Sequence, residues 1–441
     1  MRALYNLLFI AFFVLSAPYY FWKMRRRGNW RRNFGQRFGR YEGRVKQALT
    51  NSHTLWLHAV SVGEVNLCTQ LIAALEPRLP LHKFVVTTTT TTGMGELERK
   101  LPPHILRLYY PVDLRGPVKR ALGLINPRAV VLVEAEIWPN FLWRVRDRGV
   151  PLFLVNARLS PRSFPRYKRF GFLFRNIFAS FTGVGAQNES DAARLRELGC
   201  RPEAIRVVGN LKFDAARPDT RRHLDVPALL TQLGARAGAS LLVAGSTHAG
   251  EEALLAEMLP RLRRECPDLF LVLVPRHMER GQSVGEELTS RGVKFAFRTD
   301  LTAGRQFAPG SLECLLVNTT GELKYFYEHA TVIFVGKSLT AEGGQNPIEP
   351  GALGKAMLFG PHMENFPGIA DAFVKAGGAV QVPDAPALET EIAALLRDEP
   401  RRLALGMSAL NVVRENQGAV DRTVEMIVEH IAPPAHRGPR P

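Results

Sequence analysis

The stretch TVIFVGKSLTAEGGQNPIEP, Thr331–Pro350, decides the fold assignment. Its first six residues are apolar or β-branched and end on a glycine, as in a buried strand that enters a loop. The pair Gly343–Gly344 lets the backbone approach a ligand closely. Asn346 suits an N-cap, Pro347 the first helical position and Glu349 the first turn. A strand, a glycine loop and a helix N-terminus in this order present N–H groups and a partial positive charge to a phosphate.

Glu349 allows two interpretations of this helix start. Its carboxylate is placed to accept hydrogen bonds from a ribose diol. The pattern Asn-x-x-Glu from Asn346 to Glu349 also fits a capping box, which needs no ligand. These residues alone leave both open, so a nucleotide site is one of two predictions here.

Apolar, strand-like runs alternate with helical patterns through the rest of the chain. One series runs from Thr54–Val60 to Ile205–Val208, and a second from Ser240–Ala244 to Ala379–Val382. The runs between them are Lys83–Val86, Ile105–Tyr110, Ala129–Val133, Pro151–Val155 and Phe181–Ala186, then Leu269–Val274, Lys294–Phe297, Cys314–Val317, Val332–Val335 and Ala356–Phe359. Such alternation predicts parallel, doubly wound sheets. The 441 residues suffice for two of them. We predict an α/β protein of two Rossmann-like domains, with a ligand cleft at the carboxyl ends of both sets of strands.

The charged segment Leu211–Asp225 interrupts the apolar rhythm and predicts the domain junction. We therefore place one Rossmann-like domain at residues 47–215 and the other at 225–432. The Pro-rich end at 433–441 is predicted to be a disordered tail.

The segment Leu4–Trp22 carries no charge and many aromatic residues, and it is long enough to span or deeply enter a bilayer. A cleaved signal peptide is the alternative, but its basic residues usually precede the apolar run. Here only Arg2 precedes, and ten Lys or Arg against one Glu follow within residues 23–46. We predict an uncleaved anchor at 1–22 and a basic membrane-surface segment at 23–46.

The charge of the chain is concentrated beside this anchor. Residues 23–46 carry a local charge of +9, more than half of the formal net +17. Basic residues next to an apolar segment favour the cytoplasmic side and anionic headgroups. Nucleic acid would also attract such a surface, but no nucleic-acid module is recognisable, so we expect no nucleic-acid partner. Four widely spaced cysteines indicate reduced structural thiols in a cytoplasmic body.

Two acidic motifs follow strands of the first series. Ser61-Val62-Gly63-Glu64 places a carboxylate at a helix start, where Glu64 is either a general base or part of a capping box. The helix dipole is expected to lower the pKa of Glu64. Glu134 and Glu136 follow Ala129–Val133, and on an extended segment they would point the same way.

Three further motifs lie at strand ends. Lys212, in GNLKFD, is either a cation for an anionic transition state or an ordinary surface lysine. Pro275-Arg276 follows a strand of the second series, and arginine suits bidentate contact with phosphate. Thr320-Gly321-Glu322 has the same placement. The sequence holds no Asp-x-Asp or P-loop pattern and no clustered set of His, Cys or carboxylate residues at ligand spacing, so we expect no metal and no cofactor.

Taken together, these motifs resemble one family, the 3-deoxy-D-manno-octulosonic acid (Kdo) transferases of lipopolysaccharide biosynthesis. The resemblance runs over nearly the whole chain. It rests on HAVSVGEV (58–65), EAEIWPN (134–140), NARLS (156–160), AQNESD (186–191), GNLKFD (209–214), GSTHAGEE (245–252), VPRH (274–277), TGEL (320–323) and GGQNPIEP (343–350), in the family's order.

The resemblance implies an inverting, metal-independent glycosyltransferase of the GT-B type. Its donor would be CMP-Kdo and its acceptor a lipid A precursor of the lipid IVA type, at the cytoplasmic side of a bacterial inner membrane. The domain 47–215 would bind the acceptor and 225–432 the nucleotide sugar. By the same resemblance Glu64 is the general base, and Glu134 and Lys212 stabilise the transition state, with Glu136 as an alternative. The CMP-binding residues would be Pro275, Arg276, Thr320, Gly321, Glu322, Asn346, Pro347, Ile348 and Glu349.

The chain departs from the family pattern at Lys337, where a second glycine is expected after Gly336. The substitution adds a positive charge near the expected nucleotide. Two other functions fit the sequence less well: a GT-B enzyme that uses a UDP-sugar, and a non-catalytic membrane-anchored binding protein of the same fold.

Overall fold

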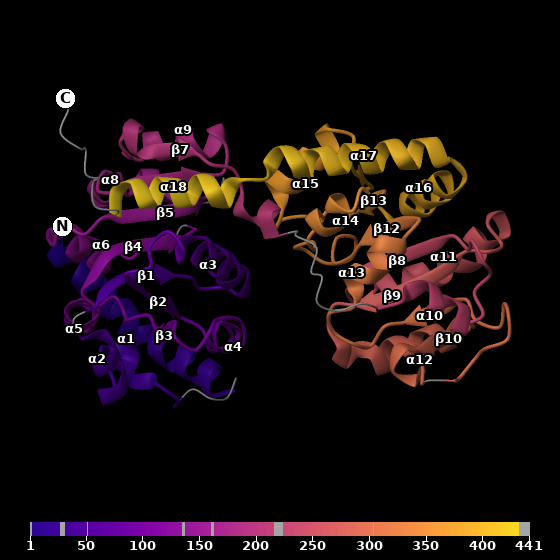
Figure 1. Ribbon diagram of the computed structural model, residues 1–441, viewed down its shortest axis with the longest axis horizontal. Coiled ribbons are helices and arrows are strands. Elements are labelled where there is room, and N and C mark those ends of the chain that lie inside the picture. Colours follow the sequence, from indigo (N-terminus) through magenta and orange to yellow (C-terminus); the bar gives the residue numbers. More distant parts are fainter. Residues whose placement is uncertain are drawn as a thin grey trace, which may run out of the picture. The chain divides into compact units, whose positions relative to one another are not determined.

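The computed structural model describes residues 2–26, 31–50, 52–134, 137–159, 163–215, 224–302 and 304–431. The chain forms two compact units (Figure 1). Unit 1 comprises Met1–Ala215 and Gln417–Pro441, and unit 2 comprises Ala216–Asn416. The predicted tail at 433–441 lies outside the described residues.

Unit 1 is built on a seven-stranded parallel sheet with strand order β3-β2-β1-β4-β5-β6-β7. Its strands are β1 (His53–His58), β2 (His82–Thr88), β3 (Leu106–Tyr109), β4 (Pro127–Val133), β5 (Leu152–Ala157), β6 (Gly183–Ala186) and β7 (Ile205–Val207). Its helices are α1 (Arg2–Arg26), η1 (Phe34–Phe38), α2 (Gly43–Leu49), α3 (Val62–Leu75), α4 (Thr91–Lys100), α5 (Arg115–Ile125), α6 (Pro139–Asp147), α7 (Phe164–Arg169), α8 (Gly171–Phe178), α9 (Glu189–Glu197), η2 (Pro202–Ala204), η3 (Leu211–Ala215) and α18 (Ala419–Ile431).

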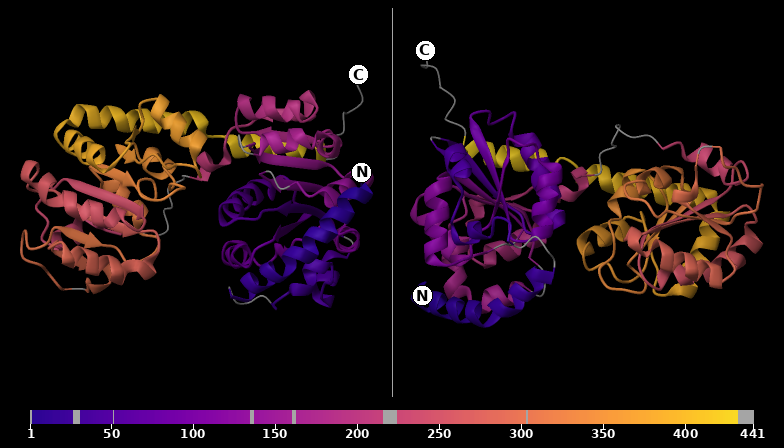
Figure 2. Two further views of the ribbon diagram at one scale, coloured as in Figure 1. Left: turned by 180° about the vertical axis from the view of Figure 1, so that it is seen from behind. Right: turned by 90° about the horizontal axis from the view of Figure 1, so that it is seen from below.

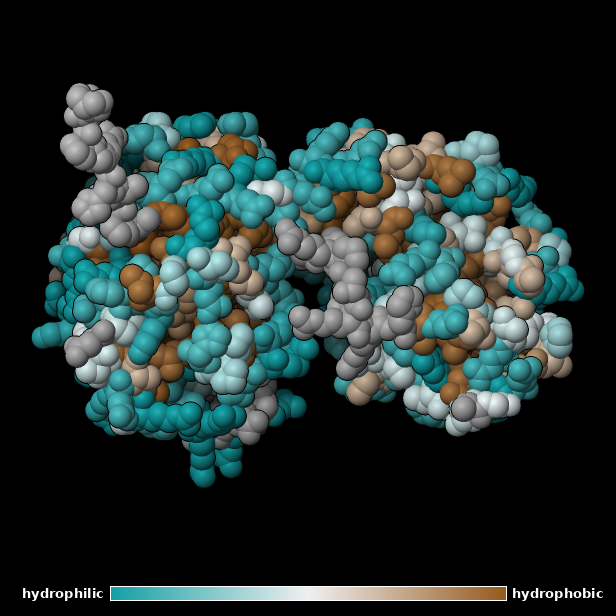
Figure 3. Space-filling model, viewed as in Figure 1, coloured by the Kyte–Doolittle hydropathy of each residue, from teal (hydrophilic) through white to brown (hydrophobic). Residues whose placement is uncertain are grey.

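Helices cover both faces of this sheet. Alternate residues of β1 enter different cores: Trp56 packs with α5 and α6, whereas Leu55 and Leu57 pack with α3 and α18. This is the period of two expected of a strand buried on both sides. On the face visible in Figure 3, the surface of each unit is mainly hydrophilic, with hydrophobic side chains in smaller patches between polar ones.

Unit 2 repeats the design with strand order β10-β11-β9-β8-β12-β13-β14, again all parallel. Its strands are β8 (Leu241–Thr247), β9 (Phe270–Pro275), β10 (Phe295–Phe297), β11 (Cys314–Leu316), β12 (Val332–Val335), β13 (Met357–Phe359) and β14 (Val380–Gln381). Its helices are α10 (Val226–Gln232), α11 (Glu251–Glu265), η4 (Met278–Arg280), α12 (Gly281–Ser290), η5 (Arg298–Asp300), α13 (Leu323–His329), α14 (Ile348–Ala352), α15 (Pro367–Lys375), α16 (Ala385–Arg397) and α17 (Glu399–Asn416). Every predicted run forms a strand, and the predicted fold class is confirmed.

The predicted end of the second domain at residue 432 is wrong. The chain returns to unit 1 after α17, and α18 packs on the sheet of unit 1 through Val420, Val424 and Ile427. Asp214 fixes its start, because its buried carboxylate accepts hydrogen bonds from the N–H groups of Gly418 (2.7 Å) and Val420 (2.6 Å). Asp214 is 204 residues away from Gly418 in the sequence, so local capping rules cannot predict this contact.

Replacing Asp214 by asparagine should destabilise unit 1. The amide retains one acceptor oxygen, so a buried N–H at the start of α18 loses its partner at a cost of about 1–3 kcal/mol. Asp421→Asn is the matched control, since Asp421 is an exposed acid in the first turn of the same helix. Chemical denaturation should lower the stability of Asp214→Asn well below that of the control. Equal stabilities would show that Asp214 does not hold α18.

Helix α1 is, among the described residues, the one helix long and apolar enough by length and composition to cross a membrane. That criterion is also met by signal sequences. Its length and composition are therefore compatible with the predicted anchor and do not by themselves decide its orientation.

Candidate active site

Each of the two sheets has one point at which its strand order reverses, and candidate residues follow the strands near that point. In unit 1 the reversal lies between β1 and β4, and in unit 2 between β8 and β12. Ligands of open α/β sheets bind at the carboxyl ends of strands beside such a reversal. Glu64 follows β1 and Glu134 follows β4, so the two carboxylates flank the reversal of unit 1.

Glu64 occupies the first turn of α3 and completes a capping box. Its N–H donates to Ser61 Oγ (3.2 Å), and its carboxylate accepts from the N–H groups of Val60 (2.8 Å) and Ser61 (3.3 Å). The side chain is buried, with 8% of the residue exposed.

The expected lowering of the pKa of Glu64 is wrong. Burial raises the pKa of Glu64 and outweighs the hydrogen bonds from Val60 and Ser61, while the nearby charge of Glu134 raises it further. Desolvation disfavours the charged carboxylate more than its hydrogen bonds favour it. A carboxyl whose pKa is raised towards neutrality is a better proton acceptor, so the capping box and the general base are compatible roles of one residue.

Glu134 adopts a left-handed backbone conformation, with φ 59°. The prediction that Glu134 and Glu136 point the same way from an extended segment therefore fails at Glu134, and Glu136 lies outside the described residues. A non-glycine residue in this region is under strain and is often held there by function. Its N–H donates to the carbonyl of Val155 (3.0 Å), so the turn continues the sheet bonding of β4 to β5.

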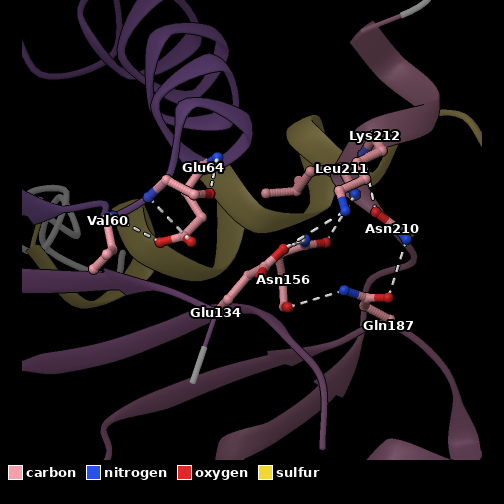
Figure 4. A network of polar contacts seen from close by, with 9 residues as sticks. Val60, Glu64, Glu134, Asn156, Gln187, Asn210, Leu211 and Lys212 are labelled. Atoms are coloured by element: carbon pink, nitrogen blue, oxygen red, sulfur yellow. Dashed lines mark hydrogen bonds and ion pairs between the residues drawn. The ribbon is translucent and has the colours of Figure 1, made fainter. Parts of the chain in front are cut away.

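Asn156, at the end of β5, is the centre of a polar network that holds this edge of the sheet (Figure 4). Its Nδ2 donates to Glu134 Oε1 (3.3 Å), and its Oδ1 accepts from the N–H of Leu211 (3.1 Å). Gln187 Nε2 donates to the Asn156 carbonyl (3.1 Å), and Asn210 Nδ2 donates to Gln187 Oε1 (3.0 Å). Four strand ends are thereby linked through amides.

Lys212 is held beside Glu134 by this network. Its N–H donates to Asn210 Oδ1 (3.0 Å), and its Nζ lies 3.9 Å from Glu134 Oε1. Both side chains remain partly exposed, at 26% and 33%. Unit 1 therefore presents a buried carboxylate of raised pKa and a solvent-accessible carboxylate–ammonium pair at one edge.

Asn156, Gln187 and Asn210 were not predicted from the sequence to have any role. A signal was present for Asn156, because asparagine tolerates left-handed backbone better than most residues, and Asn156 has φ 52°. Its buried amide positions Glu134 and η3 together, so we regard it as a positioning residue.

In unit 2, Glu349 lies among charged groups. The side chain is open to solvent, yet crowding by the protein raises the pKa of Glu349, while Asn346, Arg276 and Lys324 oppose the shift. Asn346 Nδ2 donates to Glu349 Oε1 (3.3 Å). An exposed carboxylate beside two cations is accessible to a ligand.

The details of the predicted helix start are wrong. Helix α14 begins at Ile348, and Asn346 Oδ1 accepts from the Ile348 N–H (3.1 Å). Glu349 contacts the side-chain amide of Asn346, which is not the reciprocal backbone contact of a capping box. With five residues, α14 has only a weak dipole, so a phosphate here needs side-chain cations.

The Gly343–Gly344 pair also serves a structural purpose. Gly343 N–H donates to Glu364 Oε2 (2.6 Å) and Gly344 N–H to the carbonyl of Lys337 (2.8 Å), so neither is available to a phosphate as expected. Both glycines have positive φ, and a Cβ on Gly344 would lie 2.5 Å from Met363 Sδ. The loop needs glycine for its own packing.

Lys337 itself has φ 55°, which explains why a glycine suits this position. The turn is held by Glu251, whose buried carboxylate accepts from the N–H groups of His248 (2.9 Å), Lys337 (2.7 Å), Ser338 (2.9 Å) and Leu339 (3.0 Å). This role of Glu251 was not predicted from the sequence, although Glu251 lies in the motif GSTHAGEE (245–252).

The remaining candidates of unit 2 lie at neighbouring strand ends. Arg276 is exposed after β9, and Pro275 ends that strand. Glu322 is bonded to Arg298 Nη2 (2.9 Å) and to Thr319 Oγ1 (2.5 Å), while Thr320 and Gly321 are exposed beside it. The carboxylate of Glu322 is thus engaged by protein groups and shapes the loop that carries Thr320.

A cavity of about 960 Å³ lies elsewhere in unit 1. Its lining includes Arg44, Lys83 and Leu106, which belong to α2 and to the amino-terminal parts of β2 and β3. It is not part of the strand-end site, and we assign it no role in the reaction.

Comparisons with known proteins identify the family of this chain. Residues 32–215 match the model of a family described as 3-deoxy-D-manno-octulosonic-acid transferase (kdotransferase). The 3-deoxy-D-manno-octulosonic acid transferase of Haemophilus influenzae is 30% identical over 86% of this chain and 87% of that protein. The crystal structure of UDP-GlcNAc 2-epimerase from Neisseria meningitidis bound to UDP-GlcNAc covers 85% of this chain and all of that chain, with a TM-score of 0.58.

The epimerase is only 13% identical, so it shows the fold alone, and this fold serves more than one activity. The family is assigned from sequence identity. The 3-deoxy-D-manno-octulosonic acid transferase of Bordetella pertussis is 34% identical over 92% of this chain and 94% of that protein. The chain is therefore an enzyme and belongs to the 3-deoxy-D-manno-octulosonic acid transferase family.

Proposed function

We propose that this Kdo transferase of lipopolysaccharide biosynthesis moves Kdo from CMP-Kdo to a lipid A precursor of the lipid IVA type, with inversion at the anomeric carbon and without a metal. The observation that carries the proposal is Glu64, a buried carboxylate of raised pKa at the strand-order reversal of unit 1. Glu64 takes the proton of an acceptor hydroxyl as that oxygen attacks the anomeric carbon. The bond from the anomeric carbon to the phosphate oxygen breaks in the same step, and CMP leaves. A single displacement inverts the configuration.

Glu134 and Lys212 supply opposite charges for the transition state. An oxocarbenium-like anomeric carbon gains positive charge, which the Glu134 carboxylate stabilises. Kdo itself carries a carboxylate next to that carbon, and the Lys212 ammonium compensates it. The 3.9 Å separation of Lys212 Nζ and Glu134 Oε1 supports this assignment, since one sugar ring can contact both groups.

The CMP part of the donor is assigned to unit 2. Arg276 and Lys324 are cations for the phosphate, and Glu349 accepts hydrogen bonds from the ribose diol. Their support is the electrostatic contact of both cations with Glu349. Pro275, Thr320–Glu322 and Asn346–Ile348 line the same strand ends. A monophosphate leaving group needs cationic side chains, which explains how the reaction proceeds without a divalent metal.

The same proposal places the enzyme at a bacterial inner membrane with both units on the cytoplasmic side. Its support is helix α1 and the basic segment 23–46 that follows it. An anionic lipid acceptor and an anionic leaflet both favour that arrangement.

A donor comparison tests this proposal. Purified enzyme with a lipid A precursor should release CMP from CMP-Kdo in the presence of excess EDTA, and should leave UDP-sugars intact. Loss of turnover with EDTA that returns on adding Mg²⁺ would contradict the metal-independent mechanism. Turnover of a UDP-sugar in preference to CMP-Kdo would contradict the donor.

Glu349→Gln is expected to weaken CMP binding about tenfold with little change in thermal stability. The amide still accepts the contact from Asn346, but a neutral oxygen accepts hydroxyl hydrogen bonds less strongly, a difference of about 1.4 kcal/mol. Isothermal calorimetry with CMP measures the effect. Glu342→Gln is the matched control, an exposed glutamate in the same loop. Unchanged affinity in Glu349→Gln would leave Glu349 with a structural role only.

A further inference from the structure

Helix α1 lies lengthwise on unit 1, as both views of Figure 2 show for the helix that starts at the N-terminus. One stripe of α1 is buried or half-buried and recurs every three to four residues: Arg2, Tyr5, Asn6, Phe9, Phe13, Ser16 and Ala17. That spacing is one face of an α-helix. Contacts with the body are made by Arg2, Tyr5, Asn6 and Phe9, in the amino-terminal part of the helix.

The amino-terminal end of α1 is bonded to buried polar groups of the body. The amides of Asn6 and Asn140 donate to each other (3.0 and 3.2 Å), and these residues are 8% and 4% exposed. Tyr5 OH donates to Asp113 Oδ2 (2.8 Å), and Asp113 is 2% exposed. If α1 left the body, Asp113 and Asn140 would each lose a partner, which is costly for a buried polar group.

Two further contacts fasten the same end. Arg2 forms a bidentate ion pair with Asp147, in which Nη1 donates to Oδ2 (2.6 Å) and Nη2 donates to Oδ1 (2.8 Å). The ring of Tyr5 meets Trp143 edge-on, with centroids 5.5 Å apart, and Arg2 lies over that same indole. Helix α6, which carries Trp143 and Asp147, is part of the globular fold.

The chain beyond the other end of α1 is tied to the same body. Gln36, ten residues after Arg26, is buried, and its Oε1 accepts from the N–H of Tyr109 (2.9 Å). Arg37 donates to the carbonyl of Thr89 (2.7 Å) and stacks on the Tyr109 ring. Unit 1 therefore holds the chain on both sides of α1.

The side of α1 away from the body is apolar and exposed. Leu7, Leu8, Phe12, Val14 and Leu15 are each between 56% and 81% exposed. A continuous apolar surface of this kind marks a protein or membrane contact. The basic residues that follow, among them Arg32, Arg40 and Arg44, give the adjoining segment the charge that anionic headgroups attract.

Length alone fits a span, since 25 helical residues extend about 38 Å and the hydrocarbon core is about 30 Å thick. A span, however, would put Arg2 and Arg26 on opposite faces of the bilayer. The partners of Arg2 and of Gln36 belong to one globular unit, so the contacts cannot all persist in a spanning helix.

We infer that α1 is an in-plane membrane helix: its apolar side enters the headgroup and acyl boundary of one anionic leaflet, and both of its ends stay on the side of unit 1. This inference rests on the membrane location in the proposed function. It replaces the transmembrane alternative with a monotopic one, in which the body lies against the leaflet that supplies a lipid acceptor.

The inference is tested by measuring from which side of the membrane an added cysteine can be labelled, in membranes of cells that express the full chain. The substitution Cys266→Ser removes the one cysteine that is not buried and leaves the buried Cys68, Cys200 and Cys314. Two variants are then made in this background. One carries a new cysteine in a short extension ahead of Met1, and the other carries Lys119→Cys on α5. A membrane-impermeant maleimide should label both positions in inverted inner-membrane vesicles and neither in spheroplasts. Labelling of the two positions from opposite sides would overturn the inference. Labelling of both in spheroplasts would leave α1 in-plane and contradict only the proposed cytoplasmic side.

Cross-linking tests the docked state itself. Arg2→Cys with Asp147→Cys, in the same background, should be joined by a short bis-maleimide in membranes, whereas Arg2→Cys alone should give no such product. A pair that cross-links in detergent but not in membranes would show that α1 leaves the body on insertion. A dimer that fails to bind vesicles of phosphatidylethanolamine and phosphatidylglycerol would instead assign the apolar side to a second copy.

Discussion

Turnover of CMP-Kdo by Glu64→Gln is expected to fall by roughly 10²-fold or more, the usual size of a general-base contribution. An acceptor hydroxyl is a weak nucleophile until its proton is removed, and a glutamine side chain cannot take up that proton. The substitution keeps one carbonyl oxygen to accept the Val60 N–H, so the start of α3 should persist. Affinity for CMP-Kdo should stay normal, because the loss lies in the chemical step.

The pH dependence of the rate distinguishes a lost base from a misfolded site. The base must be unprotonated, and burial raises the pKa of Glu64. The wild-type rate should therefore fall as the pH drops through a value above the ordinary range of a glutamate, and the residual rate of Glu64→Gln should lack that limb. Glu76→Gln, at the other end of α3, is the matched control and should keep both rate and profile. Near-normal turnover in a stably folded Glu64→Gln protein would move the base elsewhere, with Glu134 next.

Lys212→Met should lower turnover by about 10²-fold, near 2.7 kcal/mol of transition-state stabilisation. The substitution removes the ammonium that compensates the Kdo carboxylate and keeps a side chain of similar length. Single-turnover rates at saturating CMP-Kdo measure the effect. Lys168→Met is the matched control, because Lys168 is an exposed lysine of unit 1 that pairs with Glu197. A rate loss shared by both variants would make Lys212 an ordinary surface lysine.

Coupling between Lys212 and Glu134 gives a second measure of the same pair. Because Lys212 Nζ and Glu134 Oε1 are 3.9 Å apart, the double variant Glu134→Gln/Lys212→Met should lose less than the two single losses combined. Strict additivity would show that the residues act on the transition state independently.

The positions of the strands along the chain were predictable because they depend on local pattern. Each run of apolar residues between helical segments formed a strand, and the placement of Glu64 and Glu134 at strand ends followed from that order. The direction of the pKa shift of Glu64 did not follow. A helix start predicts a lower pKa, but the burial that reverses it arises from residues of other elements packed around the carboxylate.

Backbone conformation and long-range partners account for most of the other differences. Glu134 has a positive φ, which a glutamate in a sequence does not indicate, whereas the positive φ of Asn156 is one that asparagine permits but does not require. Gly343 and Gly344 suggested a phosphate loop, yet their N–H groups are used by Glu364 and Lys337. Helix α18 joins unit 1 through Asp214, a partner that only the folded chain brings near.

The most direct test of the central claim is the mass of the product formed from CMP-Kdo and a lipid IVA-type acceptor. Wild-type enzyme should yield acceptor whose mass has grown by one or more Kdo residues, with one CMP released for each, and Glu64→Gln should yield almost none in the same time. An acceptor of unchanged mass with the wild-type enzyme, or equal product from the folded Glu64→Gln variant, would contradict the account.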